Sequence, residues 1–103
     1  MKTVGGALIL FLLTGAGVAL ADDVESVYRI GEAIKNTGAA TGYEVQGYGR
    51  NLDIHLSSML PSDARKVAKD VCGYTQQTIK FDKPWTARFF LVVGDRPAAT
   101  CKL

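Results

Sequence analysis

This sequence has few histidines and cysteines and almost no excess of one sign of charge. Its 103 residues include one histidine, two cysteines, and 12 basic against 10 acidic side chains, for a formal net charge of +2. A near-neutral chain without a basic block gives no electrostatic case for binding nucleic acid or an anionic membrane. One histidine with two distant cysteines makes a poor zinc site. We therefore expect no metal, no other cofactor and no nucleic-acid partner.

Catalytic motifs are also lacking. The glycines between residues 38 and 49 do not form a phosphate-binding loop at the start of a helix. Asp53, His55 and Ser57 are the residue types of a hydrolytic triad, and on a strand they would share one face at intervals of about 7 Å. A triad needs its base and nucleophile within hydrogen-bonding distance, together with an oxyanion hole. We interpret the three as the solvent-facing side of a strand and predict a protein that is not an enzyme. A small hydrolase around His55 is the least favoured function.

The first 21 residues have the three parts of a cleavable secretory signal. Lys2 provides the positive charge, residues 7–13 form a short apolar run, and Ala19 and Ala21 are the small residues read by signal peptidase. The alternative is an uncleaved anchor, which needs about 20 apolar residues. Four glycines interrupt the uncharged stretch of residues 3–21, and no basic cluster follows it. We expect cleavage after Ala21, leaving a mature domain of residues 22–103 that has no stable membrane span and is periplasmic or secreted.

Both cysteines lie within this mature domain. An exported chain enters an oxidising compartment, in which two thiols normally pair. We therefore predict a disulfide between Cys72 and Cys101, closing a loop of about 30 residues and contributing about 3–4 kcal/mol to stability. In so small a domain that is a large share of the total.

Two segments have apolar residues at helical spacing. The first covers residues 24–34, where Asp22 or Asp23 can cap the helix and Gly38 can end it. Residues 39–42 are small and are interpreted as a loop. Pro61 suits the first position of a second helix over residues 61–80, and Cys72 lies on the apolar side of that helix.

Alternation of apolar and polar residues predicts strands elsewhere. Residues 43–48 and 51–57 form a hairpin with a turn at Gly49 and Arg50. Residues 85–93 alternate most clearly, and a turn over 94–97 leads to a short last strand on which Cys101 faces the second helix. The prediction is a single α+β domain of order α-β-β-α-β(-β). Its sheet is mainly antiparallel with three or four strands, and helix 61–80 packs on one face.

Phe90 and Val92 are predicted to point away from helix 61–80. Two large apolar residues on an open sheet face require cover. We expect the first helix to provide that cover, and the alternative is a surface for a partner or a second subunit. Together with Tyr48, these residues are the candidate interaction surface.

The order of helix, two strands, helix and strand over residues 22–93 resembles that of small periplasmic domains of the BON type, which are associated with membranes and phospholipid. The glycine pattern of that family is not evident here and its members are not expected to carry cysteines, so no residue roles are transferred. The resemblance implies a small-ligand or lipid-binding domain, with the ligand between the first helix and the sheet. We favour instead a small exported accessory protein that binds an unidentified envelope or extracellular protein, or a second copy of itself as a homodimer.

Overall fold

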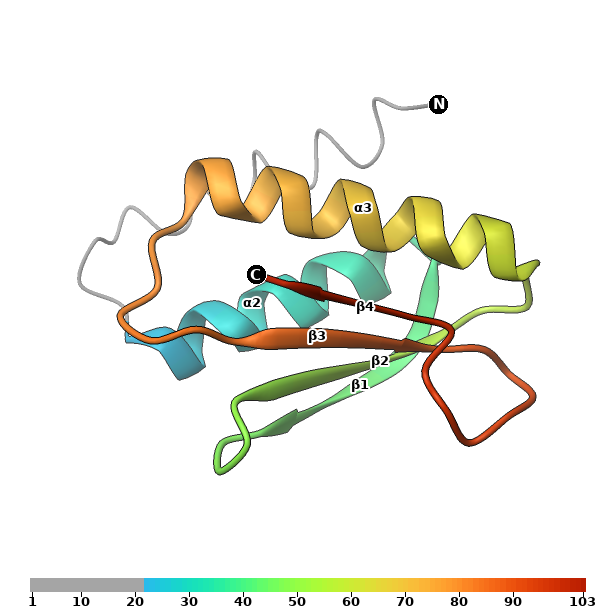
Figure 1. Ribbon diagram of the computed structural model, residues 1–103, viewed down its shortest axis with the longest axis horizontal. Helices are drawn as coiled ribbons and strands as arrows, with labels where there is room; N and C mark the ends of the chain where they lie inside the picture. The colour runs from blue at the N-terminus through green and yellow to red at the C-terminus, as the bar shows by residue number, and fades with distance from the viewer. Residues whose placement is uncertain (1–21) are drawn as a thin grey trace.

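The structure is a computed structural model that describes residues 22–103, in which two helices pack on a four-stranded sheet (Figure 1). Along the chain the elements are α2 (Asp23–Asn36), β1 (Ala40–Gln46), β2 (Asn51–Leu56), α3 (Pro61–Thr78), β3 (Thr86–Phe90) and β4 (Ala99–Lys102). This order and the α+β class confirm the prediction from the sequence. The predicted signal sequence lies outside the described residues.

The sheet is mixed and has the strand order β1-β2-β3-β4. β1 and β2 form one antiparallel hairpin, and β3 and β4 form another. The two inner strands, β2 and β3, are parallel. Parallel neighbours need a long crossover connection, and α3 provides it. Two of the three pairings are antiparallel, as expected.

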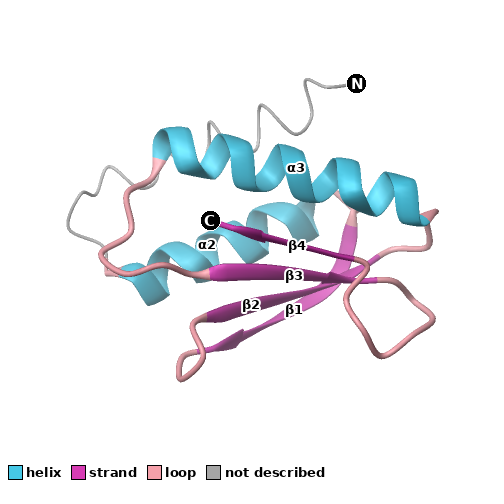
Figure 2. Ribbon diagram, in the orientation of Figure 1, coloured by secondary structure: helices cyan, strands magenta, loops and turns pink. Residues whose placement is uncertain are grey.

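Both helices lie on the same face of the sheet (Figure 2). α2 packs on β1 and β2, whereas α3 packs on β3 and β4. The register aligns the apolar strand residues beneath them in rows such as Val45–Leu52–Ala87–Cys101. Our expectation that the first helix would cover Phe90 is therefore wrong. α2 shares the face covered by α3, and neither helix covers the opposite face, which we call the open face.

The helix ends follow local capping chemistry. Asp22 accepts a hydrogen bond from the Glu25 N–H at 2.8 Å and caps α2. Gly38, with a φ of 87°, turns the chain out of the helix into β1. α3 begins at Pro61 as predicted and ends at Thr78, two residues earlier than expected.

Two strand boundaries differ from the sequence prediction. The loop predicted over residues 39–42 is wrong from Ala40 onward, because Ala40 is buried and opens β1. A β-bulge lies between Ala40 and Gly42 and hides the alternation. β3 ends at Phe90 rather than at residue 93, so Val92 lies in the loop that follows.

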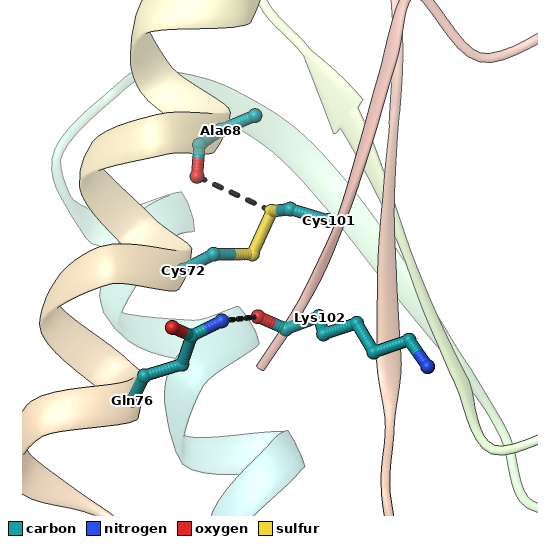
Figure 3. Close-up of a disulfide and its surroundings, with 5 residues drawn as sticks. All are labelled: Ala68, Cys72, Gln76, Cys101 and Lys102. Atoms are coloured by element: carbon teal, nitrogen blue, oxygen red, sulfur yellow. Dashed lines mark hydrogen bonds between the residues drawn. A yellow bond between two sulfur atoms is a disulfide. The ribbon is translucent and has the colours of Figure 1, made fainter.

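The predicted disulfide between Cys72 and Cys101 joins the middle of α3 to β4, with a Cα–Cα distance of 6.2 Å (Figure 3). The Cys101 sulfur contacts the Ala68 carbonyl oxygen at 3.3 Å. One helical turn after Cys72, the Gln76 side-chain amide donates to the Lys102 carbonyl oxygen at 2.6 Å. The last strand is therefore fixed to α3 by a covalent bond and a hydrogen bond.

Candidate interaction surface

The open face is built from the strand residues that alternate with the core. The register places Asp53 between Glu44 and Arg88, and His55 between Gly42 and Phe90. Most of these side chains are polar, which is typical of a sheet that faces solvent on one side. The open face consists of Gly42, Glu44, Gln46, Asn51, Asp53, His55, Thr86, Arg88, Phe90, Thr100 and Lys102.

An ion pair between β2 and β3, together with a glutamine from β1, links these three strands at the centre of this face. Arg88 donates from Nε to Asp53 Oδ1 at 2.6 Å and from Nη2 to Asp53 Oδ2 at 2.8 Å. Gln46 donates to Asp53 at 3.0 Å and accepts from Arg88 at 3.3 Å. The hydrogen bond to the Asp53 carboxylate raises the pKa of Arg88. Asp53 is only 5% exposed, so our interpretation of it as a solvent-facing residue is wrong.

The triad candidate does not form. The Asp53 carboxylate is occupied by Arg88 and Gln46, and Ser57 Oγ donates to the Gly38 carbonyl oxygen at 2.6 Å. His55 is exposed, and its ring packs beside Phe90 with centroids 5.7 Å apart. Within residues 22–103, no group of three or more His, Cys, Asp or Glu side chains is placed to hold a metal ion.

Two of the three candidate surface residues lie close together along the chain. Phe90 is half-buried at the end of β3, where Arg88 Cζ lies 5.9 Å from its ring centroid. Val92 follows in the loop and is 67% exposed. Tyr48 is fully exposed in the turn between β1 and β2. That turn adjoins Asn51, at the opposite end of β2 from the Phe90 partner His55, so the structure separates Tyr48 from the other two.

Sequence reasoning missed three residues of this region. Alternation assigned Val93 to the helix-covered side of a strand, but the strand has ended and Val93 is 85% exposed. Arg88 and Gln46 were not connected to Asp53, because cross-strand partners depend on a register that a single sequence does not reveal. We call His55, Phe90, Val92 and Val93 the Phe90 corner.

No helix in the described part of the chain is long and apolar enough to cross a membrane. Comparison with known proteins finds no family model, curated protein or solved structure that matches the chain, so the resemblance to BON-type domains is one of element order alone.

Proposed function

We propose that residues 22–103 form a small exported accessory domain that binds another protein without catalysis, through the Phe90 corner. The observation that carries this proposal is the one-sided packing of the helices, which leaves Phe90 uncovered by either of them. After Leu91, the side chains of Val92 and Val93 are exposed. Neighbouring aromatic and aliphatic side chains on a small domain are typical of the centre of a protein interface.

Packing between α2 and the sheet favours protein binding over the lipid-binding alternative. That alternative places a ligand between α2 and the sheet. There the Tyr43 ring lies directly against Gly31, so closely that an added Cβ at Gly31 would be 2.5 Å from the ring. Protein atoms fill this part of the layer, and the Phe90 corner needs no such space.

The disulfide supports the export part of the proposal. Structural disulfides persist in oxidising compartments and are rare in the cytosol. Together with the signal-like pattern in residues 1–21, this favours the periplasm or the exterior of the cell as the working location.

The proposal is tested by capture from envelope extract with tagged mature protein and two matched variants. Val92→Asp places a charge on the Phe90 corner. Leu60→Asp places the same charge at the start of α3, where the exposed fraction is 66% against 67% for Val92. We expect a partner retained by wild type and Leu60→Asp and lost with Val92→Asp. Equal capture by all three proteins would contradict the Phe90 corner, and sedimentation of the purified protein shows whether the partner is a second copy.

A further inference from the structure

The two edges of the sheet differ in how their main-chain groups are used. Leu103 N–H donates to the Trp85 carbonyl at 3.0 Å, so by alternation Thr100 and Lys102 direct their main-chain groups away from β3. The Gln76 side chain already occupies the Lys102 carbonyl. The β4 edge is also only four residues long. Short length and a covering helix are the usual ways of protecting an edge strand.

Within residues 22–103, nothing covers the main-chain groups of the β1 edge in this way. Thr86 N–H donates to the Arg50 carbonyl at 2.9 Å, so even-numbered residues of β2 face β3 and odd-numbered ones face β1. Their partners Gly42, Glu44 and Gln46 therefore face β2. The remaining residues of this stretch, Tyr43 and Val45, direct their N–H and C=O groups outward from the sheet.

The side chains beside this edge favour a particular type of partner. On the helix side, Tyr28 is 49% exposed and its ring lies 6.2 Å from that of Tyr43 in an edge-on contact. Tyr43 also donates to the Glu32 carboxylate at 2.7 Å. On the open face, Glu44 is exposed, and its side chain makes no hydrogen bond or ion pair with any described residue. The edge thus has an aromatic side and an acidic side.

We infer that the β1 edge binds an extended segment of another protein by strand addition between Gly42 and Gln46. Alternate residues of the added strand are apolar and pack beside Tyr28 and Tyr43. The residues between them are basic and lie near Glu44, since opposite charges across a strand pair stabilise it. This surface meets the Phe90 corner only where Gly42 pairs with His55, and β2 separates it from Phe90 itself.

A second copy of the chain fits this edge poorly. β1 contains no Lys or Arg, so its copy supplies no cation to Glu44. In an antiparallel pairing of two β1 edges, Tyr43 of each copy would pair with Val45 of the other. Glu44 would then lie opposite Glu44 of the copy, and like charges in that position are destabilising. The charge on the edge therefore selects a basic partner of different sequence.

The first test uses hydrogen exchange of the mature, disulfide-bonded protein with a blocked seven-residue peptide of alternating valine and lysine. We expect slower exchange of the Tyr43 and Val45 amides and no change at Thr100 and Lys102. A peptide of alternating valine and glutamate is the charge control and should protect these amides less. Equal protection by the two peptides, protection at the β4 edge, or no protection at millimolar peptide would overturn the inference.

Two variants locate the binding site. Val45→Pro removes an N–H that is directed away from β2, so it blocks addition while sparing the β1–β2 ladder. Thr100→Pro is the same change at the opposite edge and should leave peptide binding unchanged. Glu44→Lys should weaken binding of the lysine peptide about fivefold and reverse the preference between the peptides. Undiminished binding to a folded Val45→Pro protein, or a wild-type dimer that Val45→Pro dissociates, would contradict the proposal. If Val45→Pro does not fold, Glu44→Lys decides.

Discussion

At the scale of single residues, the Asp53 carboxylate depends on Arg88 for a compensating positive charge. Its nearly buried carboxylate accepts two hydrogen bonds from Arg88. Arg88→Met keeps the aliphatic stem but leaves this charge with Gln46 alone, and we expect a loss of about 2–4 kcal/mol in unfolding free energy. Urea unfolding measures this loss. Adding Asp53→Asn to Arg88→Met should recover part of it, whereas a double variant no more stable than Arg88→Met would show that the charge is not the cause.

Gly31 and Gly73 form a matched pair of helical glycines. Alanine is a better helix former than glycine by about 1 kcal/mol. At Gly31 the new Cβ would lie 2.5–2.7 Å from Tyr43 ring atoms, including Cγ, which cannot move aside without the whole ring. At Gly73 no described atom outside the neighbouring helix backbone lies within 4 Å of the new Cβ. We expect Gly31→Ala to destabilise by about 1–2 kcal/mol and Gly73→Ala to stabilise by about 0.5–1 kcal/mol in thermal or urea unfolding. A stabilised Gly31→Ala protein would contradict the close packing of α2 on β1.

Because of Tyr43, the free energy of unfolding should decrease at alkaline pH. Burial, followed by the hydrogen bond to Glu32, raises the pKa of Tyr43 from 10.0 to about 12. Because the pKa is higher in the folded protein, the stabilisation is complete below pH 10 and is lost as the pH rises from 10 through about 12. The difference in unfolding free energy between wild type and Tyr43→Phe should therefore shrink over this interval. A difference that does not change with pH would contradict the raised pKa.

A further variant separates the contributions to that shift. Glu32→Gln keeps a hydrogen-bond acceptor but removes the negative charge, so the pKa of Tyr43 should fall toward its ordinary value. Absorbance titration of the tyrosines, with Tyr43→Phe as the reference that identifies the Tyr43 step, measures this directly.

At the scale of secondary-structure elements, the disulfide holds α3 on the C-terminal hairpin. The closed loop, with a sequence separation of 29 between the cysteines, corresponds to about 3–4 kcal/mol of unfolding free energy in the chain-entropy model. We expect reduction of the wild-type protein to lower its stability by that amount. A reductant should not affect Cys72→Ala/Cys101→Ala, which provides the control. Equal stability of the oxidised and reduced wild type would show that other contacts already fix β4.

Elements were predictable from the sequence where one local signal dominates. Pro61 and the long amphipathic period defined α3, and the two cysteines allowed only one intrachain pairing. The predicted start of β1, residue 43, lies beyond its actual start at Ala40, because Ala40 and Gly42 are small and flank a bulge. β3 was extended too far, since the alternation continues through Val93 although the chain has already left the sheet.

The candidate surface was harder to predict than the elements. Alternation shows that a sheet has two faces, but it does not show which face a given helix covers. The placement of α2 beside α3, which leaves Phe90 uncovered, is a property of the whole packing arrangement. The same holds for the Asp53–Arg88 pair, because those residues are 35 positions apart and meet only through the parallel register of β2 and β3.

At the scale of the whole molecule, we predict that removal of residues 1–21 leaves the fold intact. Every described helix and strand lies between Asp23 and Lys102, and Asp22 is the cap of α2. The Asp23 carboxylate accepts hydrogen bonds from the N–H groups of Asp82 and Lys83 at 2.9 and 3.0 Å, which fixes the start of α2 to the loop before β3. Contacts within residues 22–103 thus hold the first helix in place.

The natural product should therefore begin at Asp22 and have an intact mass lower than that of the reduced chain by two hydrogen atoms. Ala19→Arg removes a small residue that the peptidase reads, so this variant should keep its N-terminal segment and stay with the membrane fraction. Edman sequencing and intact-mass spectrometry of both proteins distinguish these outcomes. A wild-type product that retains Met1, or one that carries two free thiols, would contradict export through a cleaved signal, because an oxidising compartment and a small-residue cleavage site predict the opposite.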